Sequence, residues 1–449
     1  MKTAKLRNLI LELLVRVEKD HGFSHLLINQ EIKKKELNPK DEALLTQIVY
    51  GTLERKMTLD YYLSNYVDPN KKIDDWVRML LRMSVYQMVY LDKIPDHAVI
   101  HEAVEIAKKK GHRGVQGFVN GVLRNVQRNG VRKLGEIKDP VKRLSIETSH
   151  PEWLVNRWIQ QYGFQTTEAI CHANLKQKPI SVRIQPLKVS REEAMAELKQ
   201  EGFLVKPSLF SNQGILIEKG NVLSSKLFAQ GKLTIQDESS MLVAEVLKPE
   251  PGMDVLDSCS APGGKATHIA EKMRDEGTVY AHDLHQKKVK LIEEKQETLG
   301  LSIIQATAHD ARKLKEKYGE ASFDRILVDA PCSGLGVISS KPEIKYEKSE
   351  QDIERLHTIQ LDILNHVAAL LKTDGLFVYS TCTIEKTENE QVIKSFLTKN
   401  PEFTVDADFF KELPEELQSS IGVTEYGLQL FPQSFGTDGF FLTRLKKGT

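Results

Sequence analysis

Apolar positions recur at helical spacing through the first third of the chain. Leu9, Leu13 and Val17 share one face of a predicted helix, because residues three or four positions apart lie on the same side. Residues 75–91 repeat the pattern, with arginines and a glutamine between the apolar positions. The pattern predicts an all-helical domain that spans residues 1–143.

Short strands and helices are expected between residues 144 and 236, after a stretch at 130–140 whose turn-forming and charged residues predict a linker. The expected order is strand, helix, strand, strand, helix and strand, which is typical of a small ferredoxin-like or RRM-like α+β domain. The expected strands are 181–184, 203–206, 214–218 and 232–236, and the expected helices are 191–200 and 222–228. The aromatic signature that stacks bases in an RRM is missing, so this domain is expected to brace its neighbour.

Residues 237–449 alternate β-type runs with helices, which indicates a mostly parallel sheet. The expected strands are 254–257, 279–282, 303–306, 324–328, 375–380, 428–431 and 439–445. The clearest expected helices are 265–272, 286–299, 350–371 and 389–397. The fold class is therefore multidomain α and α/β, with a Rossmann-like C-terminal domain around a seven-stranded sheet.

Length and composition fit a soluble multidomain protein, with the cytoplasm as the expected location. The 449 residues exceed one typical core, and 40% hydrophobic with 28% charged residues is ordinary for a globular chain. No apolar run is long enough for a membrane span, and the start of the chain does not read as a signal peptide, so no membrane partner is expected. The four cysteines form no Cys-x-x-Cys pair, which argues against a metal site and a disulfide framework.

Charge is distributed unevenly along the chain. Residues 1–143 hold 27 Lys and Arg against 18 Asp and Glu, although the net charge of the whole chain is only +1. Basic residues gather between Lys108 and Arg128, around a glycine turn. Such a cluster can neutralise RNA phosphates, although a solvated, lysine-rich helical surface would look the same. We expect an RNA-facing helical domain.

A glycine turn follows the first strand of the C-terminal domain. Its members are Cys259, Ser260, Ala261, Pro262, Gly263, Gly264 and Lys265. Glycines let the backbone approach a ligand closely, and the helix start behind them favours a carboxylate or phosphate. Asp283 ends the second strand, where it can accept both hydroxyls of a ribose, and Asp310 after the third could accept from an adenine amine. Each aspartate could instead cap the helix that follows it.

A carboxylate and two thiols follow the fourth and fifth strands. Asp329 and Cys332 come after the fourth strand, and Cys382 comes after the fifth. Because these strands are expected to end side by side in a parallel sheet, both thiols can face one pocket despite their separation in sequence. Two packed cysteines without a chemical role are the alternative.

These three groups suit methyl transfer to carbon 5 of cytosine. A thiolate that adds to carbon 6 turns the ring into an enamine, which can attack a methyl sulfonium. A second group must then help to remove the carbon-5 proton, while Asp329 hydrogen-bonds ring nitrogen 3 or the exocyclic amine. An amine methyltransferase needs an aromatic residue at position 332, so Cys332 favours carbon over nitrogen as the acceptor.

Three motifs carry a family resemblance: Ala-Pro-Gly-Gly-Lys at 261–265, Asp-Ala-Pro-Cys-Ser-Gly at 329–334 and Ser-Thr-Cys-Thr at 380–383. Together they resemble the RNA 5-methylcytosine methyltransferases of the NOL1/NOP2/Sun family. Residues 50–53, 94–99 and 120–124 resemble the NusB-like domain fused to some RNA methyltransferases. With that domain, the whole chain is similar to the bacterial 16S rRNA enzymes of the family.

The resemblance implies a role for each motif. Cys382 would be the nucleophile, and Cys332 would assist proton removal or product release. Asp329 would contact the target base and border the cofactor, S-adenosylmethionine. The residues from Cys259 to Lys265, with Asp283 and Asp310, would hold that cofactor.

Other functions stay open beside this one. The same chemistry could act on tRNA or another rRNA site, or the chain could be a catalytically silent RNA-binding or ribosome assembly factor. Intact Cys332 and Cys382 argue against a silent factor, because binding alone needs neither thiol. We expect a monomer that acts on 16S rRNA, naked or in a partly assembled small subunit. Ser339 and Ser340 stand where the family usually has two arginines, which puts a phosphate or substrate contact there in doubt.

Overall fold

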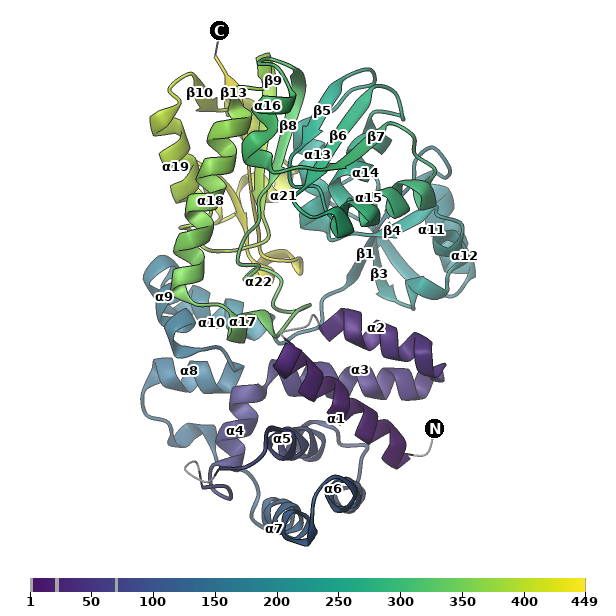
Figure 1. The fold of residues 1–449 in the computed structure, drawn as a ribbon, viewed down its shortest axis with the longest axis vertical. Helices are drawn as coiled ribbons and strands as arrows, with labels where there is room; N and C mark the ends of the chain where they lie inside the picture. Colours follow the sequence, from purple (N-terminus) through teal and green to yellow (C-terminus); the bar gives the residue numbers. More distant parts are fainter. Residues whose placement is uncertain (1–2, 21–23, 69–71, 449) are drawn as a thin grey trace. The chain divides into compact units, whose positions relative to one another are not determined.

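The structure is a computed structural model that describes residues 3–20, 24–68 and 72–448 (Figure 1). Contacts group the chain into two compact units. The first comprises Met1–Lys176 and Ile338–Glu347, and the second comprises Gln177–Val337 and Lys348–Thr449. The division into domains at residues 143 and 236 stays a prediction.

Helices build the first unit, as the hydrophobic pattern predicts. They are α1 (Thr3–Asp20), α2 (Ser24–Lys35), α3 (Pro39–Glu54), α4 (Lys56–Leu63), α5 (Asp75–Tyr90), α6 (Asp96–Lys110), α7 (Arg113–Asn129), η1 (Leu134–Glu136), α8 (Pro140–Thr148), α9 (Glu152–Tyr162), α10 (Phe164–Ala173) and α17 (Ile344–Glu347). Leu9, Leu13 and Val17 of α1 are buried in one core with apolar side chains of α3, α5, α6 and α7. Within the described ranges, no helix of either unit is both long and apolar enough to cross a membrane.

Residues 130–140, predicted as a linker, pack against the first unit. The Tyr61 hydroxyl donates to the carbonyl of Lys133 at 3.1 Å, and the Tyr66 hydroxyl donates to that of Gly130 at 2.6 Å. Val131 and Leu134 contact the helical core. The turn-forming residues therefore connect helices inside one unit, because the flanking apolar residues bury themselves against it.

The segment Ile338–Glu347 belongs to the first unit although the sequence on both sides of it belongs to the second. The Glu343 carboxylate accepts hydrogen bonds from the backbone and hydroxyl of Ser24. The Lys345 ammonium is fully buried and donates to the carbonyl of Glu54 at 2.8 Å. Burial lowers the pKa of Lys345 to about 7. Ser339 and Ser340 lie at the start of this segment.

A four-stranded antiparallel sheet opens the second unit, in the order β2-β3-β1-β4. Its elements are β1 (Ile180–Ile184), α11 (Arg191–Gln200), β2 (Leu204–Pro207), β3 (Gly214–Lys219), η2 (Val222–Ser224), α12 (Lys226–Ala229) and β4 (Leu233–Ile235). This is the predicted ferredoxin-like topology. The helix predicted at 222–228 is wrong in detail, because Ser225 caps a new helix by accepting from Phe228 N and so divides the segment.

The large sheet follows the order β11-β12-β13-β9-β8-β5-β6-β7, with β10 paired to β13. Its strands are β5 (Asp254–Asp257), β6 (Thr278–Asp283), β7 (Ile304–Ala308), β8 (Phe323–Asp329), β9 (Leu371–Thr381), β10 (Phe403–Val405), β11 (Val423–Thr424), β12 (Gly427–Leu430) and β13 (Phe440–Lys447). The strands β5 to β9 pair in parallel, as predicted. The predicted count of seven is wrong for the described chain, which has nine, because β10 and β11 are too short to show an alternating pattern.

Helices cover both faces of the large sheet (Figure 1). They are α13 (Glu238–Leu247), α14 (Gly264–Lys272), α15 (Gln286–Leu299), α16 (Leu314–Lys317), η3 (Ala311–Lys313), α18 (Glu350–Ala368), α19 (Glu390–Lys399), α20 (Ala407–Glu412), α21 (Glu415–Gln418) and α22 (Pro432–Phe435). Leu327 and its neighbour Val328 point to opposite faces, so that Leu327 packs with α13 to α15 and Val328 with α18 and α19. Helix α18 ends before the predicted residue 371 because Leu371 already pairs with Phe323 in the sheet.

Candidate active site

The site lies where the parallel strands end. From β5 the chain continues to β6 and β7 on one side, while β8 and β9 lie on the other, and ligands bind at such a switch in strand order. A cavity of about 430 Å³ opens there. Its lining includes Ser258, Cys259, Ala261, Asp283, His285, Asp310, Arg312, Asp329, Cys332, Ile359, Ile363 and Cys382.

The glycine turn takes the conformation that its sequence predicts. Gly263 has a φ of +91°, and α14 begins at Gly264. A Cβ atom at position 263 would lie 3.1 Å from the Cα of Ile292, so a larger residue would meet both strain and a close contact. Ser260 N donates to the carbonyl of His282 at 2.7 Å, which ties the turn to the end of β6.

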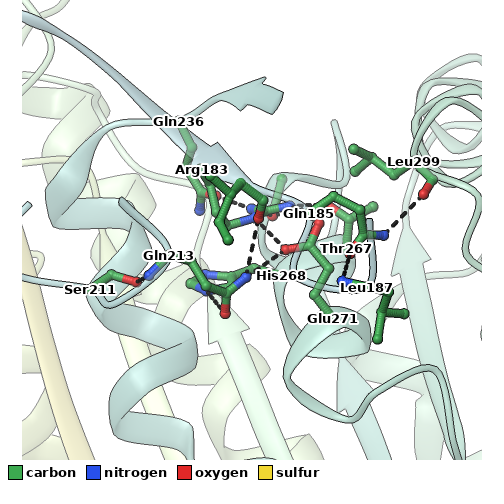
Figure 2. A network of polar contacts seen from close by, with 12 residues as sticks. Arg183, Gln185, Leu187, Ser211, Gln213, Gln236, Thr267, His268, Glu271 and Leu299 are labelled. Atoms are coloured by element: carbon green, nitrogen blue, oxygen red, sulfur yellow. Dashed lines mark hydrogen bonds and ion pairs between the residues drawn. The ribbon is translucent and has the colours of Figure 1, made fainter. Parts of the chain in front are cut away.

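Arg183 of the small sheet contacts the turn and the helix that follows it, and Figure 2 shows the network of polar contacts around its guanidinium. Its guanidinium donates to the carbonyl of Gly264 at 2.9 Å and to the Thr267 hydroxyl at 3.0 Å. It also forms a two-pronged ion pair with Glu271 of α14, at 2.7 and 2.9 Å, and neither side chain is exposed. Burial raises the pKa of Glu271 despite the opposing charge of Arg183. The small sheet thus contacts the glycine turn and α14 through a buried arginine.

Neutral side chains complete this network. The Gln213 amide nitrogen donates to Glu271 Oε2 at 2.9 Å, and its amide oxygen lies 3.2 Å from His268 Nε2. Gln236 accepts a hydrogen bond from Arg183 (Figure 2). Sequence reasoning missed Arg183 and Glu271. The available signal was an arginine among apolar residues in a short strand, at a position that the sheet buries.

The two predicted cofactor carboxylates differ in their surroundings. Asp283 is 9% exposed, lines the cavity and accepts from His285 N at 3.1 Å. Asp310 is bound at both oxygens by Arg312, and these hydrogen bonds lower the pKa of Asp310. Asp310 also accepts from Arg312 N and caps η3, so the alternative of a helix cap is realised there while its carboxylate still borders the cavity.

The cavity suits a nucleoside-type cofactor. Asp283 offers a largely buried acceptor for ribose hydroxyls, and Ile359 with Ile363 supplies an apolar wall for a flat ring. Cys259 also lines this space, but burial raises the pKa of its thiol, so it lies there as a packed neutral group. The donor set and the cavity therefore fit S-adenosylmethionine.

The two predicted thiols converge. Cys332 and Cys382 lie on the loops that follow β8 and β9, and their Sγ atoms are 3.3 Å apart. A hydrogen bond to Cys382 and burial together raise the pKa of Cys332 well above its ordinary value. The two sulfur atoms are close enough to share a proton, with either thiol as the donor.

Asp329 is fixed beside these thiols. Lys265 Nζ lies 2.6 Å from Asp329 Oδ2, and the Ser380 hydroxyl donates to Oδ1 at 2.7 Å. Burial works to lower the pKa of Lys265, but Asp329 outweighs it and the pKa is raised. Behind them, burial and the charge of Asp329 raise the pKa of Asp257 to about 7.

A buried glutamate that sequence reasoning missed supports the Cys332 loop. Glu388 accepts from Ser333 N at 2.8 Å and from the Ser333 hydroxyl at 2.5 Å. Gln360 donates to it at 3.0 Å and to the carbonyl of Pro331 at 2.9 Å. Burial raises the pKa of Glu388 in spite of these hydrogen bonds. The residue immediately after Cys332 is thus held at both its backbone and its side chain.

The predicted site residues divide between two spaces. A second cavity, of about 250 Å³, is lined by Ser260, Ala261, Pro262, Gly264 and Lys265 together with Asp329 and Cys382. Ala261, Asp329 and Cys382 border both cavities, whereas Asp283, Asp310 and Cys332 border only the first. The reacting groups therefore lie between two spaces, which a transfer between two ligands requires.

Comparisons with known proteins identify the family. The model described as 16S rRNA methyltransferase RsmB/F matches residues 244–446, the NusB family model matches 4–128, and an RsmF/B-like ferredoxin-like model matches 150–223. The probable ribosomal RNA small subunit methyltransferase B of Bacillus subtilis is 47% identical over 447 residues, which cover 100% of each chain. Ribosomal RNA small subunit methyltransferase B of Pseudomonas syringae pv. tomato is 36% identical over 93% of this chain and 91% of that protein.

Solved structures agree with these matches, one of them over the whole chain. The crystal structure of PH0851 has a TM-score of 0.84 at 28% identity and covers 100% of this chain and 99% of that one. A methyltransferase homolog from Pyrococcus horikoshii has a TM-score of 0.59 at 27% identity over 69% of this chain and all of that one. With a full-length relative at 47% identity and matching models in all three predicted parts, this chain belongs to the 16S rRNA methyltransferase RsmB/F family.

Proposed function

We propose that this protein methylates carbon 5 of a specific cytosine in 16S rRNA, through a covalent bond between Cys382 and the base. The coarser statement follows from the family: the protein is an S-adenosylmethionine-dependent rRNA methyltransferase. The observation that carries the finer proposal is the pair of sulfur atoms 3.3 Å apart, beside the fixed Asp329 carboxylate.

The two thiols support different roles. Cys382 as a thiolate adds to carbon 6 of cytosine, forms a carbon–sulfur bond and leaves carbon 5 electron-rich. When bound, S-adenosylmethionine supplies the methyl group that carbon 5 accepts. As the bond between Cys382 and carbon 6 breaks, Cys332 at 3.3 Å gives its proton to the departing sulfur and takes up the carbon-5 proton in its place, which restores the double bond. Cys382 releases one proton to solvent before the next turnover, which matches the proton that carbon 5 has lost.

Asp329 supports recognition of the base. Its carboxylate borders both cavities and is held at both oxygens, so its direction is set before the base arrives. A fixed carboxylate can accept a hydrogen bond from the exocyclic amine of cytosine. Uracil has a carbonyl oxygen at that position, which cannot donate, so the same contact disfavours it.

Asp283, the glycine turn and the apolar wall would hold the cofactor. Asp283 would accept hydrogen bonds from the ribose hydroxyls. Asp310 is paired with Arg312 but also borders the cavity, and it would accept a hydrogen bond from the adenine amine there. Gly263 adopts a positive φ without strain, which would let the backbone turn closely around the methyl donor.

RNA is the substrate that the family implies, and we propose the 16S molecule, naked or in a partly assembled small subunit, as the specific one. The basic residues of α6 and α7 support RNA binding by the helical unit, because Lys108, Lys109, Lys110, Arg113, Arg124 and Arg128 are all exposed. A monomer acting in the cytoplasm fits this substrate. The target base must leave its stack to reach Cys382, which favours a loop or single-stranded segment.

Bisulfite sequencing of 16S rRNA tests the proposal, because 5-methylcytosine resists conversion. RNA from cells without this protein should lose one resistant cytosine, and the purified protein with S-adenosylmethionine should restore it. A strain that carries only Cys382→Ala is the control and should stay unmodified. Methylation at a ring nitrogen or an amine, or of tRNA alone, would contradict the proposal.

A further inference from the structure

We propose that Lys295 binds a backbone phosphate of the substrate RNA, in the second cavity beside Cys382. The inference deepens the proposed function and rests on it, because it names how the RNA strand is held at the same site. Lys295 lies in the last part of α15 and lines that cavity with Ser239, Ser240, Lys265 and Phe440.

The second cavity is the one on the RNA side. Asp283 and Asp310 line only the first cavity, which assigns that space to the cofactor. Cys382 and Asp329 border both, so a base that meets Cys382 opposite the cofactor must occupy the second. A nucleotide there brings at least one phosphate to the cavity wall. A phosphate needs a cation or several N–H donors once it leaves bulk water.

Among the cations near the start of α14, Lys295 is the one that has no carboxylate partner within the described residues and can pair with a phosphate. Three cations gather around the start of α14: Arg183 is paired with Glu271, and Lys265 is paired with Asp329. Lys295 forms no ion pair and no hydrogen bond with any residue that the structure describes. Its Nζ atom would lie 3.9 Å from a Cβ placed on Gly264, so the charge sits directly at the glycine turn.

Other charged groups near this cavity are already engaged. Asp237 and Asp438 also line it, but both pair with Lys178, Asp237 at 2.7 Å. Burial, with the charges of Arg183 and Lys265, lowers the pKa of Lys295 to about 8, and the opposing charge of Glu271, which is paired with Arg183, does not offset this. A partly desolvated ammonium near two other cations gains from an incoming anion. A lysine suits a phosphate as a compact point charge.

The test is Lys295→Gln, with Lys290→Gln as the matched control, because Lys290 is exposed on the same helix. Binding of a 16S rRNA fragment is measured over a range of salt concentrations, and binding of S-adenosylmethionine is measured without RNA. We expect RNA affinity to fall roughly tenfold at low salt for one lost charged contact. The slope of log affinity against log salt should become shallower by about 0.7, the value for one phosphate on a single strand.

Three readouts separate this proposal from a structural effect. Cofactor affinity should stay unchanged in Lys295→Gln, KM for RNA should rise more than kcat falls, and Lys295→Arg should restore the salt slope. An unchanged slope, or a loss of cofactor affinity in place of RNA affinity, would overturn the proposal. If the wild-type protein leaves carbon 5 of cytosine unmodified but Lys295→Gln still lowers the slope, the proposed function fails and the phosphate site stands.

Discussion

Two buried glutamates support the two halves of the active site in different ways. Glu271 stands behind the glycine turn and is paired with the guanidinium of Arg183, while Glu388 stands behind the Cys332 loop and accepts from the neutral Ser333 and Gln360. Removing one member of a buried ion pair leaves the other charge without compensation. A glutamate held by neutral donors can be replaced by an amide at much smaller expense. Substitutions at the buried ion pair of the cofactor half should therefore lower stability strongly. Substitutions at Glu388 in the reacting half should lower it much less.

The largest effect is expected at the reacting atoms themselves. Cys382→Ala should abolish methyl transfer, because carbon 6 then has no nucleophile to activate carbon 5. Cofactor affinity should change little, since Asp283 and the glycine turn are unaltered, although Cys382 borders the first cavity. Transfer of labelled methyl groups to rRNA measures the first expectation, and calorimetry measures the second.

Cys332→Ala is the companion variant that assigns the two thiols. If Cys332 assists release, this variant should accumulate a covalent protein–RNA complex that survives denaturing electrophoresis. The reverse result, an adduct in Cys382→Ala and none in Cys332→Ala, would exchange the two roles. Cys171→Ala is the matched control, because this cysteine is buried in the first unit, whereas Cys332 and Cys382 belong to the second.

The second-largest effect, a loss of stability, is expected when the guanidinium that contacts the glycine turn is removed. Arg183→Met leaves the Glu271 carboxylate buried without its ion pair, and we expect a loss of about 3–5 kcal/mol in the free energy of unfolding. Urea denaturation measures it. The double variant Arg183→Met with Glu271→Gln should regain part of that loss, because no uncompensated charge stays buried.

An exposed arginine provides the control for Arg183. Arg355 on α18 has 72% of its side chain exposed, so Arg355→Met should change stability by less than about 0.5 kcal/mol. Equal effects of the two substitutions would show that the buried pair does not support the turn. If the Arg183→Met protein folds and binds the cofactor as tightly as the wild type, Arg183 does not position the glycine turn for cofactor binding.

A smaller and more local effect is expected at Asp283. Asp283→Asn should weaken S-adenosylmethionine binding by about 1–3 kcal/mol, the range for a hydrogen bond to a charged group. RNA affinity should be unchanged, because Asp283 lines only the first cavity. Asp408→Asn is the control, since that carboxylate is 64% exposed. A loss of RNA affinity without a loss of cofactor affinity would contradict the assignment of the two cavities.

The smallest effect should be that of Glu388→Gln, and it should depend on pH. Burial raises the pKa of Glu388, so the folded protein binds this proton more tightly than the unfolded chain does. The group therefore stabilises the fold at acid pH, and its contribution declines as the pH rises above 4.5, the ordinary value, through the folded-state pKa. Glutamine cannot ionise, so the difference in unfolding free energy should move in favour of the variant from pH 4.5 to 8. A difference that stays flat over this range would mean that folding does not raise the pKa of Glu388.

The sequence alone predicted the elements and the order in which they carry chemistry. Strands such as β5 and β8 were predicted with few errors, because a central parallel strand is buried on both faces and leaves a short continuous apolar run. The helices of the first unit were predicted from apolar positions spaced three and four residues apart. The rule that parallel strands end at one edge then placed Asp283, Asp329, Cys332 and Cys382 in one region, and all four line one cavity.

Only the tertiary structure decided which groups are partners. The distance of 3.3 Å between two sulfur atoms and the division of the site into two cavities are features with no local signature in the sequence. Arg183 and Glu271 are 88 positions apart, and the segment Ile338–Glu347 joins a unit whose other residues end at Lys176. A side chain's periodicity is set by its nearest neighbours in the chain, whereas its charge partner is set by packing between elements. That is why the strand ends could be read from the sequence and the lysine left without a partner could not.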